Sequence, residues 1–141
     1  MRRTLIALVI SALALVGVLA ANAATAKTVK FEIALKGTNE KPAAPASNRG
    51  KVELTLNTTT GRVCWDFKLA KIDGKPAQAH IHKGKAGVSG NIVVPLGANY
   101  KRQGCTSAAK SLVKSIAGHS ALYYVNVHNA KHPLGAMRGQ L

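Results

Sequence analysis

The stretch Ala79-His80-Ile81-His82-Lys83-Gly84 indicates both the fold and the chemistry of this chain. In an extended strand alternate side chains lie on the same face, so His80 and His82 share one face and the apolar residues beside them occupy the other. A second segment, Tyr123-Tyr124-Val125-Asn126-Val127-His128, ends on another histidine. The two segments therefore predict two half-apolar strands that carry three histidines.

Short segments with the same alternation run along the rest of the chain. A turn over residues 58–61 separates two of them, which predicts a hairpin. Residues 92–96 are apolar throughout, which predicts a short strand buried on both faces, and Pro95 indicates that one side of it lacks a hydrogen-bonded neighbour. The other predicted strands cover residues 29–35, 52–56, 63–69, 122–128 and 137–141.

Residues 106–118 depart from this pattern. Thr106 or Ser107 can cap the start of a helix, and Gly118 suits the residue after its last turn. Short strands at regular intervals, with hairpin turns and no alternating helices, predict an all-β antiparallel sandwich with this one short helix. Apolar residues recur at helical spacing in this segment, namely Ala109, Leu112, Val113 and Ile116.

Three blocks follow one another in a specific order. They are Ala-His-Ile-His-x-Gly at residues 79–84, Gly-x-Ile-Val-Val-x-Leu at 90–96, and Tyr-Tyr-Val-Asn-Val-His at 123–128 with a closing Gly-x-x-Arg-Gly-Gln-Leu at 135–141. Together they resemble the CHRD domain, a module named from chordin and found in bacterial secreted proteins as well as in animal ones. The resemblance runs from about residue 29 to residue 141. It implies an immunoglobulin-like β-sandwich or barrel without a settled biochemical activity.

The first 23 residues have the features of a signal peptide. Arg2 and Arg3 precede an apolar run over residues 4–20, and Ala21-Asn22-Ala23 fits the pattern of a cleavage site. Cleavage after Ala26 fits almost as well. The alternative is a membrane anchor, because an apolar stretch of this length is near the minimum for a span. The small residues at its end favour cleavage, so we expect one periplasmic or secreted domain over residues 24–141.

The charge of the chain favours anionic partners. Cleavage after Ala23 leaves 18 basic and 5 acidic residues, a formal charge of +13. Such a charge suits anionic polysaccharide, lipopolysaccharide or a surface protein. The alternative is a solvated surface that keeps an exported protein soluble, since the lysines form no compact run. Specific nucleic-acid recognition is disfavoured, because Tyr100, Tyr123 and Tyr124 are the only aromatic residues left for stacking.

Cys64 and Cys105 are the only cysteines of the chain. In an exported protein an even pair usually forms a disulfide, and we expect that bond here. A redox thiol pair is the alternative, but the spacing is not Cys-x-x-Cys.

The histidines are candidate ligands of Zn or Cu. Imidazoles at i and i+2 on a strand can both reach one ion at about 2.0 to 2.1 Å, and His128 from another strand would complete a set with His80 and His82. His132 is a candidate fourth ligand or a surface residue. The His-x-His pair is similar in part to the ligands of Cu/Zn superoxide dismutase, but the chain shows no bridging histidine with its own ligand set and no obvious ligand aspartate.

The alternative is that His80 and His82 only hydrogen-bond backbone carbonyls or Asn126 and hold neighbouring strands together. Catalytic residues are not predicted, because no Gly-x-Ser-x-Gly segment is present and the five carboxylates are isolated in the sequence. The sequence therefore predicts an exported binding or structural module of undefined ligand. A histidine-based Zn or Cu protein is the alternative function.

Overall fold

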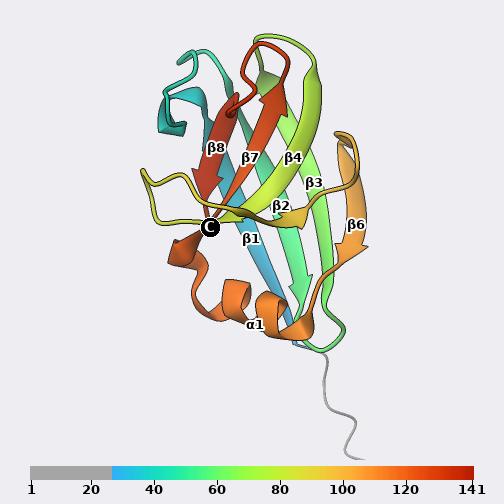
Figure 1. The fold of residues 1–141 in the computed structure, drawn as a ribbon. Coiled ribbons are helices and arrows are strands. Elements are labelled where there is room, and N and C mark those ends of the chain that lie inside the picture. The colour runs from blue at the N-terminus through green and yellow to red at the C-terminus, as the bar shows by residue number, and fades with distance from the viewer. Residues whose placement is uncertain (1–26) are drawn as a thin grey trace, which may run out of the picture.

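The computed structural model describes residues 27–141, so the predicted signal peptide and both of its cleavage sites lie outside the described residues. Eight antiparallel strands form one sheet in the order β5-β4-β7-β8-β1-β2-β3-β6. The sheet curls into a nearly closed barrel (Figure 1), which confirms the predicted all-β fold with one short helix. The strands are β1 (Thr28–Lys36), β2 (Arg49–Asn57), β3 (Arg62–Lys71), β4 (Pro76–Lys83), β5 (Ile92–Pro95), β6 (Gln103–Ser107), β7 (Tyr123–Asn129) and β8 (Met137–Gln140).

The apolar faces of the strands form the interior of the barrel. In β2 and β3 every second residue is buried, and the predicted inward position of Trp65 and Phe67 is confirmed. Ile81 of β4 and Val125 of β7 face each other across the sheet and are also buried. The alternation therefore leaves the histidines of β4 on the outer face of the barrel.

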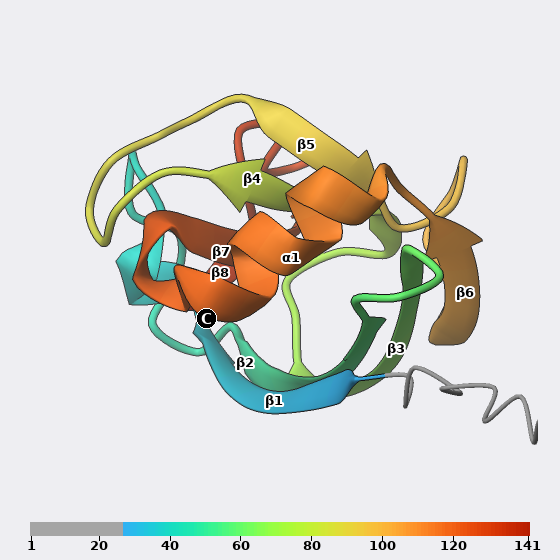
Figure 2. The same ribbon diagram turned by 90° about the horizontal axis from the view of Figure 1, so that it is seen from below.

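One helix and one loop complete the barrel. Helix α1 (Lys110–Gly118) lies across one end of it (Figure 2) and buries Val113 and Ile116 in the core. Residues 96–102 connect the two sides of the sheet, because Leu96 N donates to Ala79 O of β4 and Phe67 N of β3 donates to Arg102 O. Short 3-10 helices, η1 (Gly37–Asn39) and η2 (Ser120–Leu122), flank β1 and β7. No helix within residues 27–141 is long and apolar enough to cross a membrane.

Two local predictions are wrong. The helix begins at Lys110 and has no side-chain cap, because Thr106 and Ser107 belong to the unpredicted strand β6, where backbone pairing with β3 overrides helical propensity. Strand β5 is not buried on both faces, since Ile92 is 50 % exposed. It lies at the edge of the sheet, which agrees with the missing neighbour that Pro95 indicates.

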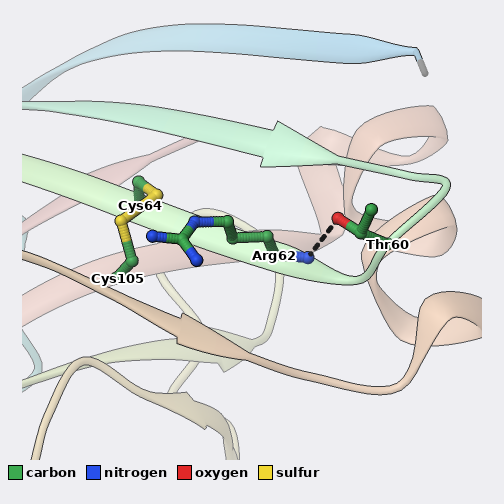
Figure 3. The surroundings of a disulfide bond; sticks show 4 residues. All are labelled: Thr60, Arg62, Cys64 and Cys105. Atoms are coloured by element: carbon green, nitrogen blue, oxygen red, sulfur yellow. Dashed lines mark hydrogen bonds between the residues drawn. A yellow bond between two sulfur atoms is a disulfide. The ribbon is translucent and has the colours of Figure 1, made fainter.

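The expected disulfide between Cys64 and Cys105 is present (Figure 3). The two residues lie directly opposite each other in the pairing of β3 with β6. The bond therefore fixes β6, the last strand in the order of the sheet, to its single neighbour.

Candidate functional site

A second buried cluster, made of polar side chains, lies on the outer face of β4, β7 and β8. Strand pairing sets His80 beside Asn126 and Asn126 beside Arg138, so alternate residues of three strands form one row. All three side chains are buried, although they point away from the apolar core. Three loops cover them, namely residues 37–48, 84–91 and 130–136, which contribute Glu40, Gly90 and Pro133 to the contacts of the cluster.

The three predicted histidines converge in this cluster. His80 and His82 come from β4, and His128 comes from the neighbouring strand β7. Their ring centroids lie 5.0 Å apart for His80 and His128, 5.6 Å for His80 and His82, and 6.0 Å for His82 and His128. One ring nitrogen from each residue lies within 4.8 Å of the other two. The sequence pattern therefore predicts correctly which histidines come together.

Two backbone carbonyls fix the orientation of the rings. His82 Nδ1 lies 2.9 Å from Gly90 O, and His128 Nδ1 lies 3.0 Å from Pro133 O. A carbonyl oxygen only accepts, so Nδ1 carries the hydrogen in both rings and Nε2 of the neutral ring keeps a lone pair. This arrangement is the one that usually orients a histidine ligand toward a metal ion.

Three ring nitrogens of the cluster have no hydrogen-bond partner of good geometry among the described residues. Nε2 of His82, Nε2 of His128 and Nδ1 of His80 are all buried without a hydrogen-bond partner among the described residues. Burying an unpartnered polar atom costs free energy, and such atoms usually have a ligand, water or functional role. Each of the three converging rings therefore carries one such nitrogen, and the three residues could hold a metal ion.

The cluster also favours the neutral form of its histidines. Burial lowers the pKa of His80 to about 4, and the nearby rings of His128 and His82 contribute to this decrease. Burial lowers the pKa of His82 and of His128 as well, although their carbonyl partners, and for His82 also the nearby Asn126 side chain, oppose it. Metal ions bind neutral imidazole, so the three rings are in their ligand form at neutral pH.

His132, the candidate fourth ligand, lies apart from the other three. Its Nε2 is 3.5 Å from Asp73 Oδ2, and Lys131 Nζ binds the other oxygen of the same carboxylate at 2.6 Å. The hydrogen bond from Lys131 is the main reason why the pKa of Asp73 lies below its usual value. The converging set therefore consists of three histidines.

A buried ion pair borders the histidines. Arg138 Nε donates to Glu40 Oε2 at 3.1 Å, and Glu40 is fully buried. Burial raises the pKa of Glu40 to about 7 although the positive charge of Arg138 opposes this shift. On the other side, the guanidinium carbon of Arg138 lies 4.2 Å from the ring centroid of Tyr124, which stacks on His82.

Sequence reasoning missed most of the residues around the histidines. Asn126, the predicted hydrogen-bond partner, lies in the cluster, but the sequence shows Glu40 only as an isolated carboxylate. Tyr124 and Arg138 alternate with inward residues of β7 and β8. The alternation of side-chain direction along a strand is therefore enough to predict that both lie on the same face as the histidines. For Glu40 no such signal exists, because residues 40–48 form an irregular loop.

A family model described as the CHRD domain matches residues 31–141, nearly the whole described chain. The chain belongs to the CHRD domain family. No curated protein and no solved structure matches it at a significant level. The matched region of this CHRD domain contains every residue of the histidine cluster and both cysteines. Membership makes the chain a binding or structural module, and its disulfide fits a protein outside the cytoplasm.

Proposed function

We propose that this CHRD domain binds one Zn or Cu ion through His80, His82 and His128. The observation that carries the proposal is the convergence of three buried ring nitrogens that lack a protein partner. Imidazole nitrogen suits both metals, which bind at about 2.0 to 2.1 Å. Nitrogens around one tetrahedral ion lie about 3.3 Å apart at that bond length, so small movements of the rings would close the site.

Three protein ligands leave a coordination position for water or another small ligand. His128 is the most accessible of the three residues, so the open position would face solvent on its side. The proposal is limited to binding an ion. Export to the periplasm or the exterior, where the predicted signal peptide would send the chain, is part of the same proposal.

Metal analysis of protein purified without a tag tests this function. We expect about one equivalent of Zn or Cu after exposure to the metal and desalting, and an increase in melting temperature with added metal. His80→Ala should abolish both effects. His119→Ala is the matched control, because His119 is exposed and lies outside the cluster. Wild-type protein that retains no metal and melts at the same temperature with and without it would refute the proposal.

The surface charge supports a second function, the binding of an anionic polymer. All five carboxylate side chains of the chain are paired with a basic residue of the same domain. These pairs occupy five of the eighteen lysines and arginines of residues 27–141, which leaves thirteen without a carboxylate partner in the described chain. Unpaired cations of this number attract polyanions and raise their association rate.

Retention on heparin and on immobilised lipopolysaccharide tests this second function. We expect strong retention and elution that depends steeply on salt, because each neutralised anionic group releases a counterion. An uncharged domain of similar size serves as the control. Elution together with that control would exclude the polymer and leave a surface protein as the remaining predicted partner.

A further inference from the structure

Arg138 is a buried arginine outside the apolar core, with 3 % of its surface exposed. Its Nε donates to Glu40 Oε2 at 3.1 Å, and its Nη1 donates to the carbonyl oxygen of Val88 at 3.0 Å. A buried ion pair is weak evidence for stability, because removing two charges from water costs about as much as their attraction returns. The contacts of this pair indicate a more specific role.

The contact of Arg138 with the Val88 carbonyl leads to His82 through the loop over residues 84–91. Val88 lies in this loop, and Gly90 follows it by two residues and accepts the hydrogen bond from His82 Nδ1 at 2.9 Å. The backbone of the loop packs closely at this point, because a Cβ added to Gly90 would clash with the carbonyl oxygen of Lys83. Arg138 therefore holds the segment whose carbonyl sets the protonated nitrogen of His82.

The contact of Arg138 with the Tyr124 ring also leads to His82. The guanidinium carbon of Arg138 lies 4.2 Å from the centroid of the Tyr124 ring. That ring stacks on His82 with centroids 4.8 Å apart and planes only 8° from parallel. The Tyr124 hydroxyl also accepts a hydrogen bond of 3.1 Å from Gly90 N, so both contacts meet at the same glycine.

We infer that Arg138, with its charge balanced by Glu40, is a positioning residue that holds His82 in the orientation required of a metal ligand. This inference rests on the proposed metal site. Arg138 touches both structures that border the His82 ring, the loop and the tyrosine, while His128 takes its carbonyl from a different loop. Glu40 accepts the hydrogen bond of Arg138 Nε and offsets part of the positive charge beside the proposed ion.

The double variant Arg138→Met with Glu40→Gln tests the inference, because it removes both charges together and leaves neither buried alone. The first readout is the set of 15N chemical shifts of the histidine rings in metal-free protein at neutral pH, which distinguish a protonated from an unprotonated nitrogen. We expect His82 to carry its hydrogen on Nδ1 in the wild type and to populate both tautomers in the variant. The tautomer of His128 should not change.

The second readout is Zn affinity, which should fall about tenfold in the double variant, as is usual when an outer partner of a ligand is lost. Asp66→Asn with Arg102→Met is the matched control, because it removes an exposed ion pair from β3 and its neighbouring loop. This control should change neither readout. A folded Arg138/Glu40 variant in which His82 keeps the Nδ1 hydrogen alone would overturn the inference.

Two further outcomes are decisive. If the double variant does not fold, Arg138→Lys replaces it, because it keeps the charge beside Glu40 and removes the planar guanidinium that contacts Val88 O and the Tyr124 ring. A second His82 tautomer in Arg138→Lys supports the inference, and the wild-type tautomer alone contradicts it. If the wild type binds no metal, the proposed function fails, but the tautomer of His82 still decides whether Arg138 positions that ring.

Discussion

The ring of His82 lies nearly parallel to the ring of Tyr124, with centroids 4.8 Å apart. The stack belongs to a buried polar layer on the outside of the barrel, separate from the apolar core. The same layer buries His80 and His82, partly covers His128 and lowers the pKa values of all three, which has consequences for metal binding, acid stability and mutational tolerance.

Metal affinity should be insensitive to pH over a wider range than in an ordinary histidine site. Protons compete for a ligand only below its pKa, and the pKa of His80 falls from 6.5 to about 4, with those of His82 and His128 lowered in the same direction. We expect Zn affinity to stay nearly constant from pH 7.5 through the ordinary histidine pKa of about 6.5 and to fall only at lower pH. Competition with a chromophoric chelator, corrected for its own protonation, measures this. A steep loss of affinity between pH 7 and pH 6 would contradict the prediction.

Replacing Glu40 should make stability rise more steeply with pH. Burial raises the pKa of the Glu40 carboxyl from its ordinary value of 4.5 to about 7 in the folded protein. The protonated carboxyl therefore contributes its full stability below pH 4.5, and this contribution is lost as the pH increases toward 7. Histidines with lowered pKa act in the opposite direction, because the unfolded chain binds their protons more tightly between pH 4 and 6.5. In Glu40→Gln only the effect of the histidines remains, so the free energy of unfolding should increase more steeply with pH than in the wild type.

Urea unfolding of Glu40→Gln at pH 4.5, 5.5 and 6.5 measures this slope. Glu32→Gln, a change at an exposed carboxylate, is the control and should follow the wild type. Parallel curves for Glu40→Gln and the wild type would show that the carboxyl of Glu40 is not buried as described.

Loss of the disulfide should weaken the fold but spare the proposed metal site. The bond closes a loop with a sequence separation of 41, so its removal should cost about 4 kcal/mol on the chain-entropy model. Cys64 and Cys105 lie on β3 and β6, whereas the histidines lie on β4 and β7. The double variant Cys64→Ser with Cys105→Ser tests both expectations. Denaturant unfolding measures the loss of stability, and Zn titration measures the metal affinity. An unchanged free energy of unfolding would contradict the expected loss of stability.

Gly135 should tolerate no side chain. Its φ of +140° is unfavourable for other residues, and a Cβ there would clash with the carboxyl group of Glu40. We expect Gly135→Ala to lower the free energy of unfolding by about 2 kcal/mol or more, since backbone strain and overpacking act together. Gly118→Ala is the control, because nothing lies within 4 Å of the added carbon and the change should be neutral or slightly stabilising. Equal stability of the two variants would argue against the packing of Glu40 under Gly135.

Period-two alternation predicts much of this fold. It places Ile33, Leu54 and Trp65 in the core and puts His80 and His82 together, because side-chain direction in a strand depends only on local geometry. It fails at residues 106 and 107, where pairing with β3 and the nearby disulfide decide the structure. Long-range pairing of this kind leaves no local signal in the sequence.

In the candidate site, too, residues on regular strands could be predicted and groups in irregular loops could not. The three histidines could be predicted because they occupy regular strands, and they converge as the pattern indicates. Their supporting groups could not, because the carbonyls of Gly90 and Pro133 belong to irregular loops and any residue supplies a carbonyl. The burial of the outer face depends on these loops, so alternation alone gave no reason to expect a second, polar layer.

The pairing of β4 with β7 has a further consequence for folding. A slip of one residue between these strands would turn His80 and His82 into the apolar interior and bring Ala79 and Ile81 to the outside. A misaligned barrel would therefore have no metal site at all. An ion that requires nitrogens from both strands would stabilise only the correctly aligned molecule, and so would select the native alignment during folding.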